Sequence, residues 1–504
     1  METDQKKDFL NKLRIILWPI ERFELKKFLP MAFMLFFILF NYTVLRSLKD
    51  ALVITNVGAE ATSFLKLWGV LPSAVIFMVV YAELVNIMNQ EKVFYCITGF
   101  FIAFFVAFLL ILYPNADAIH PDPVKIQHWA AEYPRMKWFI FLYGKWIYAL
   151  FFINAEIWGS MMVSLLFWQF ANKITSTSEA KRFYAMFGVI ANISGVVAGQ
   201  LLMYLTSNAS SLDGELDASS NNFATFVVPK IMIFSIISGF VIVGLFRWMH
   251  KYVLTDPRYY TPREKKQKTK LSLGESFKLI LSSKYLGLIV LLILCYGISM
   301  NLIEGPWKQK VRELYPSSHE YLNFMGRLNS WTGGISLIFF IIGTNILRKF
   351  NWFTAAIMTP LMMLVTGTIF FVFSLYSGKL SDFTLMIFGI TPLTMAVVFG
   401  MIQNILSKST KYSLFDSTKE MAYIPIDEEL KTKGKAAVDV VGGRLGKSGG
   451  ALILSTLVTL FPEGGFNGNI GSIMVMFLII MFIWIYAVSA LSKEYQKSLA
   501  ETKE

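Results

Sequence analysis

The sequence contains little cysteine, little histidine and little charge. Only two cysteines and four histidines occur among 504 residues. Both cysteines, Cys96 and Cys295, lie in apolar runs, so neither a disulfide framework nor a Cys/His metal site is expected. Charged residues make up 16% of the chain, well below the quarter or so that is typical of soluble domains. An ordinary soluble enzyme is therefore excluded.

The N-terminal stretch also lacks the features of a targeting peptide. Its residues, METDQKKDFLNKLRIILWPIERFELKKF, include neither the apolar core nor the small-residue cleavage site of a secretory signal. They are not rich in Ser and Arg, as a transit peptide would be. Residues 1–27 are expected to form an amphipathic lead-in on the cytoplasmic side.

The sequence is instead rich in long runs of hydrophobic residues. Hydrophobic residues make up 55% of the chain, and phenylalanine alone occurs 45 times. Runs of about 20 apolar residues recur, and this is the length that a helix needs to cross a hydrocarbon core of about 30 Å. The sequence therefore predicts an all-α integral membrane protein with about twelve transmembrane helices. The predicted spans are 28–45, 64–88, 93–113, 138–170, 182–205, 223–248, 285–303, 320–346, 352–375, 382–406, 436–461 and 469–491.

The distribution of basic residues predicts the orientation. If the N-terminus is cytoplasmic, 32 of the 47 Lys and Arg residues lie in cytoplasmic segments and 10 in external ones. The positive-inside rule then places both termini in the cytoplasm. The net charge of +13 has this membrane explanation, so nucleic acid is not an expected partner.

A basic segment, residues 251–284, divides the predicted spans into two groups of six. Weak internal similarity at an offset of 254 residues, which places Gly188 on Gly442, favours a duplication. Two parallel six-helix bundles around a central cavity form the major-facilitator arrangement. The predicted parts are a lead-in at 1–27, a bundle at 28–250, the linker at 251–284, a second bundle at 285–492 and a cytoplasmic tail at 493–504.

The eleventh predicted span carries two cations. Arg444 and Lys447, in the stretch GKAAVDVVGGRLGKSGG, are three residues apart and so share one helical face. A cation at this depth costs about 2.5–3.5 kcal/mol on insertion scales and usually marks a substrate path. A P-loop is excluded because Val441 stands where that motif requires glycine. Either the pair binds a polyanion, or it is a structural pair closed by a carboxylate on another helix.

Polar groups also interrupt other predicted spans or their ends. Arg46 and Lys49 share a face after the first span, Lys66 opens the second, Glu156 lies within the fourth, and Glu304 ends the seventh. Collected in a cavity, these cations would suit a substrate with several negative charges. The alternatives are that Arg46, Lys49 and Lys66 lie in an external loop and that Glu156 forms a structural salt bridge.

Long motifs of the chain resemble those of one family. They are FLPMAFMLFFILFNYTVLRSLKD, AEIWGSM, SEAKRFYAMFG, YGISMNLIE, KYSLFDSTKEMAYIP and GKAAVDVVGGRLGKSGG. The chain thereby resembles the ATP/ADP translocases, the non-mitochondrial nucleotide transporters of obligate intracellular bacteria and plastids. The resemblance implies antiport of external ATP for internal ADP, and the missing transit peptide favours the inner membrane of an intracellular bacterium.

The resemblance also implies a set of site residues. The family's functional charged residues match Lys66, Glu156, Glu304 and Lys447, while Arg444, Arg46 and Lys49 come from the charge pattern alone. The expected mechanism is alternating access, with the polyphosphate between Lys66 and Lys447 and with repulsion between cations preventing closure of the empty carrier. No cofactor, metal or enzymatic activity is expected.

Other functions remain open at this level. One is a proton-coupled or broader-specificity importer of nucleoside triphosphates from the same family, with Glu156 or Glu304 as the proton carrier. A membrane nucleotide hydrolase and a transporter of another anion, such as a sugar phosphate, are further alternatives.

Overall fold

A computed structural model of the chain contains helices and no strands within the residues that it describes. The described residues are 18–211, 222–259, 283–426, 438, 445–446 and 448–501. Ten described helical stretches are long and apolar enough to cross a membrane, or eleven if a bent pair is counted as one span. A shorter apolar helix, Ser448–Leu460, lies where the eleventh span was predicted. The predicted all-α membrane fold is confirmed.

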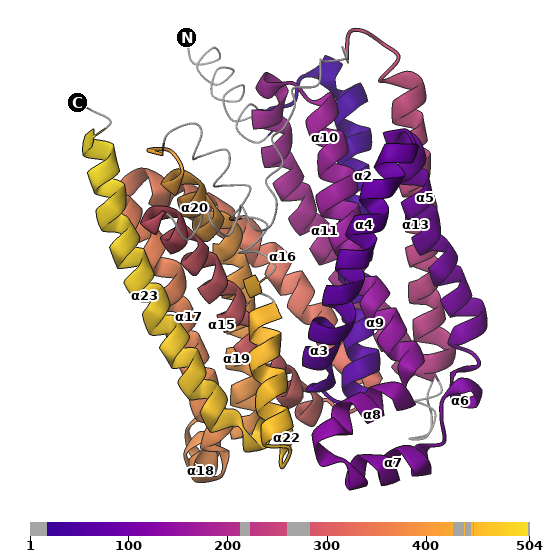
Figure 1. Cartoon of the computed structure of the whole chain (residues 1–504), viewed down its shortest axis with the longest axis vertical. Coiled ribbons are helices and arrows are strands. Elements are labelled where there is room, and N and C mark those ends of the chain that lie inside the picture. The colour runs from indigo at the N-terminus through magenta and orange to yellow at the C-terminus, as the bar shows by residue number, and fades with distance from the viewer. Residues whose placement is uncertain are drawn as a thin grey trace.

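The chain folds into two groups of helices (Figure 1). The first group contains α2 (Leu25–Asn56), α3 (Ala61–Phe64), η2 (Leu65–Val70), α4 (Leu71–Ile87), α5 (Gln90–Ala107), α9 (Trp146–Trp158), η5 (Gly159–Phe167), α10 (Trp168–Ile174), α11 (Thr177–Ser211) and α13 (Val228–Tyr252). The second contains α15 (Lys284–Leu314), α16 (Ser318–Lys349), α17 (Trp352–Leu375), α18 (Ser377–Phe388), α19 (Pro392–Thr410), η7 (Lys411–Phe415), α20 (Asp416–Ala422) and α23 (Ile470–Glu501). We call these groups the N-terminal and C-terminal halves.

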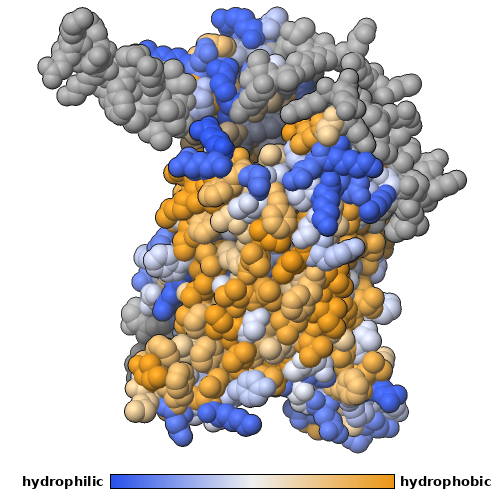
Figure 2. Space-filling model, turned by 90° about the vertical axis from the view of Figure 1, so that its left-hand side faces the viewer, coloured by the Kyte–Doolittle hydropathy of each residue, from blue (hydrophilic) through white to orange (hydrophobic). Residues whose placement is uncertain are grey.

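A hydrophobic belt surrounds the helices. The flank in Figure 2 shows a broad hydrophobic band between hydrophilic ends. Large exposed side chains such as Ile479, Phe482 and Val365 contribute to the apolar surface of the C-terminal half. Such a surface is stable against lipid and not against water. The start of α2 and the end of α23 lie at the same end of the molecule, at the top of Figure 1, and we call this the terminal end.

Several predicted spans have different limits in the structure. The helices of the first and seventh spans, α2 and α15, continue past the predicted ends at 45 and 303 to Asn56 and Leu314. The fourth, predicted at 138–170, begins only at Trp146, because the backbone leaves the helical conformation at Lys145. The separate helix α8 (Lys137–Gly144) precedes this break and packs against α7 (Pro123–Glu132).

The tenth span differs more. A bend of 81° separates α18 from α19, and Gly389 there adopts the left-handed conformation with φ of 66°. Glycine allows this backbone conformation without strain. Helix then continues from Pro392 through η7 to Ala422, so the predicted end at 406 is wrong. The segment 407–422 was expected to lie in the cytoplasmic connection to the eleventh span, as short amphipathic helices on the membrane face; it continues the helix instead.

The halves pack directly against each other through α11 and α16. A Cβ atom on Gly199 of α11 would lie 2.4 Å from the carbonyl oxygen of Gly326 on α16. Only glycine allows the two backbones to approach this closely. The predicted domain limits near 250 and 285 remain a prediction, since residues 260–282 lie outside the described part.

Candidate functional site

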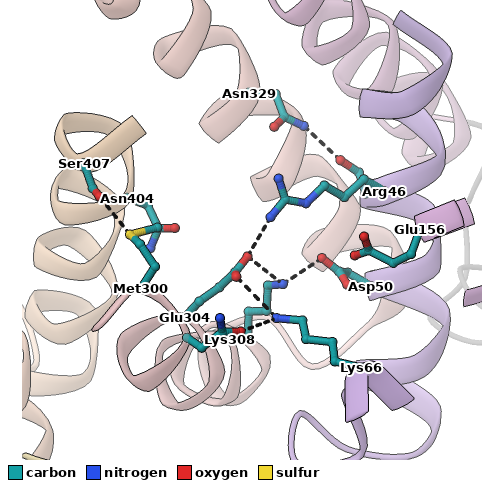
Figure 3. Close-up of polar contacts among 12 residues, drawn as sticks. Arg46, Asp50, Lys66, Glu156, Met300, Glu304, Lys308, Asn329, Asn404 and Ser407 are labelled. Carbon is teal, nitrogen blue, oxygen red and sulfur yellow. Dashed lines mark hydrogen bonds and ion pairs between the residues drawn. The ribbon is translucent and has the colours of Figure 1, made fainter. Parts of the chain in front are cut away.

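Two helices from opposite halves carry five of the charges at the site, three of which were predicted. α2 holds Arg46, Lys49 and Asp50, and α15 holds Glu304 and Lys308. Spacings of three and four residues place the charges of each helix on neighbouring positions of its surface. The two charged surfaces face each other (Figure 3), so the residues form one cluster between the halves.

Glu304 is the centre of this cluster. Its Oε1 lies 3.1 Å from Arg46 Nη2 and 2.9 Å from Lys308 Nζ, and its Oε2 lies 3.5 Å from Lys66 Nζ. Lys66 also donates a hydrogen bond of 2.9 Å to Asn301 Oδ1. Because Arg46 and Lys66 belong to the N-terminal half, a single carboxylate of α15 joins the halves.

Asp50 forms a second bridge. Its two oxygens lie 2.7 Å from Lys49 Nζ and 2.8 Å from Lys308 Nζ. Lys49 also pairs with Glu156 Oε1 at 3.0 Å, and its ammonium lies 3.7 Å from the centre of the Phe152 ring. The alternative that Lys49 lies in an external loop is wrong, since its side chain is 1% exposed within α2.

The cluster has an excess of positive charge. Four cations, Arg46, Lys49, Lys66 and Lys308, meet three carboxylates, Asp50, Glu156 and Glu304. If all are ionised, one positive charge is left over in a region where ions cost several kcal/mol unless they are paired. An anion entering the cluster would therefore be stabilised.

The charged side chains of the cluster differ in how far they are exposed to solvent. The side chains of Lys49, Asp50 and Lys308 are 5% exposed or less, so they are already fully enclosed by protein. Arg46 is 34% exposed and Lys66 is 24% exposed. A ligand can therefore reach Arg46 and Lys66 without unpacking the helices.

The structure brings together five of the seven predicted site residues: Arg46, Lys49, Lys66, Glu156 and Glu304. The other two, Arg444 and Lys447, lie outside the described residues. Asp50 was missed, although it directly follows Lys49 in the sequence. Lys308 lies one turn after Glu304, and that spacing was the available signal for it.

Further contacts join the halves at the end away from the termini. Thr55 Oγ1 and Ser318 Oγ are 2.5 Å apart, and Arg312 donates to the Thr55 carbonyl oxygen at 3.3 Å. Glu60, in the loop before α3, accepts a 2.9 Å hydrogen bond from the Phe466 backbone N–H. Burial raises the pKa of the Glu60 carboxyl, and that hydrogen bond opposes the rise. This end of the molecule is closed.

The described residues contain no group of three or more His, Cys, Asp or Glu side chains that could hold a metal ion. The lysine, arginine and carboxylate side chains that meet in the cluster form ion pairs and hydrogen bonds. Cations that can be reached from solvent and that are held by exchangeable carboxylates suit the binding and release of an anion.

Comparisons with known proteins agree with this arrangement. Residues 3–495 match the family model described as TLC ATP/ADP transporter. ADP,ATP carrier protein 1 of Rickettsia conorii is 50% identical over 507 residues, covering 100% of both chains. ADP,ATP carrier protein 1 of Rickettsia prowazekii is 50% identical over 499 residues, covering 98% of both. ADP,ATP carrier protein 3 of Rickettsia conorii is 47% identical, covering 97% of this chain and 98% of that one.

Solved structures show the same fold at low identity. A bacterial homologue of the iron transporter ferroportin, in an inward-facing state, has a TM-score of 0.57 at 12% identity, covering 93% of this chain and 100% of that one. The xylose transporter XylE from E. coli, in an inward open conformation, has a TM-score of 0.52 at 12% identity, covering 92% and 95%. The fold is that of major-facilitator-like transporters, and the sequence match over nearly the whole length shows that the chain belongs to the TLC ATP/ADP transporter family.

Proposed function

We propose that this chain exchanges external ATP for internal ADP across the inner membrane of an intracellular bacterium, with both termini in the cytoplasm. The family model and the names of relatives at about 50% identity support a nucleotide carrier. The observation that carries the proposal is the cluster with excess positive charge around Glu304, because it joins the halves and includes cations that a polyphosphate can reach.

In this mechanism Glu304 occupies the place of a phosphate while the carrier is empty. Opening the closed end separates Glu304 from Arg46 and Lys66, which are its partners in the other half. A pair of unit charges 4 Å apart attracts by about 4 kcal/mol at an effective dielectric of 20. Nucleotide phosphates binding Arg46 and Lys66 would replace that attraction, so opening becomes easier when substrate is bound.

This pairing changes the explanation for obligatory exchange. The sequence led to the hypothesis that repulsion between unpaired cations blocks closure of the empty carrier. In the structure each cation around Glu304 is paired with a carboxylate across the boundary: Arg46 and Lys66 with Glu304, and Lys308 with Asp50. We therefore propose that ion pairs keep the empty carrier closed at one end and that substrate releases them. Lys447 and Arg444 stay proposed phosphate ligands on the evidence of sequence alone.

The test is counter-exchange in vesicles reconstituted with the full chain. Labelled ADP inside should leave rapidly when ATP is outside and slowly into nucleotide-free medium. Glu304→Gln should lower the exchange rate at least tenfold, because it removes a carboxylate that pairs with three cations. Glu313→Gln, on the same helix, is the matched control. The partners that the structure gives Glu313, Lys310, Gln309 and Asn467, all belong to the C-terminal half, so this variant should exchange normally.

Other outcomes would favour the alternatives. Net uptake into empty vesicles, driven by a pH gradient alone, would indicate a proton-coupled importer. Equal exchange of ATP, GTP, CTP and UTP would indicate a broader-specificity carrier. We expect the nucleotide to be recovered intact after transport, and its hydrolysis by the purified protein would contradict a purely transporting role.

A further inference from the structure

One cation halfway along the tenth span has no ion-pair partner among the residues that the structure describes. Lys408 is near the middle of the helical stretch from Pro392 to Ala422. Its side chain is half-buried, and among the described residues its ammonium has no hydrogen bond or ion pair. By contrast, Lys411, three residues further on, pairs with Asp416 at 2.9 Å. Lys408 is therefore a charge that no described residue pairs.

Lys408 lies close to the cluster around Glu304. Its charge interacts with those of Arg46, Lys308, Glu304 and Asp50. Figure 3 places its neighbour Ser407, with Asn404, on a helix across from Arg46. Ser407 donates to the Met300 sulfur and is thereby held against α15. Two cations from opposite halves, Arg46 and Lys408, are thus near each other.

An aromatic side chain accompanies each of these cations. Tyr42 precedes Arg46 by four residues on α2, and Tyr412 follows Lys408 by four residues on η7. Residues four apart share a helical face, although the π-helical turn at η7 shifts this register somewhat. Tyr42 and Tyr412 lie within electrostatic range of each other across the boundary, as do Arg46 and Lys408. Each half therefore contributes one cation and one tyrosine to this region.

A glycine contacts the Tyr42 ring, and another contacts the residue after Tyr412. The Tyr42 ring packs on Gly159, where an added Cβ would lie 2.3 Å from the ring. The η7 backbone beside Tyr412 packs on Gly343 of α16, where an added Cβ would lie 2.7 Å from the Ser413 Cβ. The Tyr412 side chain itself stays 59% exposed. The Lys411 ammonium lies 4.6 Å from the centre of the Tyr412 ring, so one face of the ring is left for stacking.

We propose that Lys408 and Tyr412 contact the transported nucleotide: the Lys408 ammonium binds a phosphate oxygen together with Arg46, and the Tyr412 ring stacks on the base. This inference rests on the proposed function and extends its site to α19 and η7. If Lys408 is ionised when the anion binds, the excess of the cluster rises to two positive charges, which matches a ligand with several negative charges. Stacking on an aromatic ring is a usual way of holding a base.

The experiment uses ADP counter-exchange by the full chain in vesicles, together with inhibition by inorganic tripolyphosphate, which has no base. Lys408→Gln should raise the KM for ADP about tenfold or more and weaken tripolyphosphate inhibition to a similar extent. Lys408→Arg should restore most of the affinity for ADP and most of the inhibition by tripolyphosphate. Tyr412→Ala should raise the KM for ADP at least about fivefold and leave tripolyphosphate inhibition unchanged, and Tyr412→Phe should behave as the unaltered protein.

Lys349 is an exposed lysine in the last turn of α16. Lys349→Gln is the control and should change neither the KM for ADP nor the inhibition by tripolyphosphate. Protection of each purified variant by ADP against thermal unfolding gives a second measure of binding that does not depend on transport. An unchanged KM and unchanged inhibition in Lys408→Gln would overturn the phosphate contact. Equal weakening of ADP and tripolyphosphate by Tyr412→Ala would overturn the stacking contact. Failure of the unaltered chain to exchange ATP for ADP would instead refute the proposed function.

Discussion

Asp50 holds two lysines in place, although nothing in the sequence singled it out. Its carboxylate lies between the ammonium groups of Lys49 and Lys308, and its side chain is 5% exposed. The first span was predicted to end at 45, so Asp50 was assigned to its outer margin. The helix in fact continues to Asn56, which places Asp50 inside the protein.

Replacing Asp50 by Ala should therefore destabilise the protein strongly. Removing one partner of a buried ion pair leaves an unpaired charge and typically costs about 3–5 kcal/mol. Here it would leave Lys49 with Glu156, and Lys308 with Glu304, as their remaining partners. The measurement is the Tm of the purified protein in detergent, with exposed Asp382→Ala as the control. A Tm equal to that of the control would show that the ion pairs of Asp50 do not stabilise the protein.

At the residue level, the sequence predicted the identity of the charged site residues more accurately than their position in the fold. Arg46, Lys66, Glu156 and Glu304 stand out because charge interrupts or closely borders an apolar run, and the structure brings all four together. Lys408 was assigned to a loop because the apolar run ends before it. A helix that lines a polar site loses its hydrophobic signal before the helix itself ends, so hydropathy places such residues outside.

Among the helical elements, π-helical turns border the site at three places. η2 contains Lys66, η5 begins three residues after Glu156, and η7 contains Tyr412. Such turns are rare and are frequent at functional sites, because the wider turn changes the direction of the following side chains. No residue pattern specifies them, so the sequence did not predict them. Regular helices and their apolar faces, by contrast, follow from composition and length.

The contact between α11 and α16 gives a prediction at the level of elements. Gly199→Val should prevent the halves from packing as they do here, since even a Cβ would lie 2.4 Å from the Gly326 carbonyl oxygen. A carrier that cannot close one end cannot complete its cycle, so ATP/ADP exchange should fall at least tenfold. The measurement is counter-exchange in vesicles at matched amounts of inserted protein.

Gly195→Val is the matched control for this prediction. Gly195 lies on the same helix, one turn away, and a Cβ there would meet nothing within 4 Å. The control should therefore insert and exchange normally. If both valine variants exchange equally well, the close approach of α11 and α16 is not needed for transport.

For the whole molecule, the sequence predicted two parallel bundles but not the state in which they meet. Contacts from Thr55 to Ser318, from Asn329 to Ser47 and from Phe466 to Glu60 all join the halves away from the terminal end. A transporter sequence must allow at least two arrangements of its halves, and similar helix faces serve both. Periodicity and charge therefore cannot indicate which end is closed.

A disulfide across the closed end tests alternating access directly. Thr55→Cys with Ser318→Cys, after Cys96→Ser and Cys295→Ala, places two thiols where the hydroxyl oxygens are 2.5 Å apart. Oxidation should stop ATP/ADP exchange, and reduction should restore it, because the cross-link holds the two halves together at this end. Excess nucleotide during oxidation should slow cross-linking, since an exchanging carrier spends part of its time open there.

The control for this prediction is Ser336→Cys with Ser409→Cys. The hydroxyls of Ser336 and Ser409 are 2.9 Å apart within the C-terminal half, so a cross-link between cysteines at these positions should leave exchange largely intact. Full exchange by the completely cross-linked Thr55/Ser318 variant would show that this end need not open during transport.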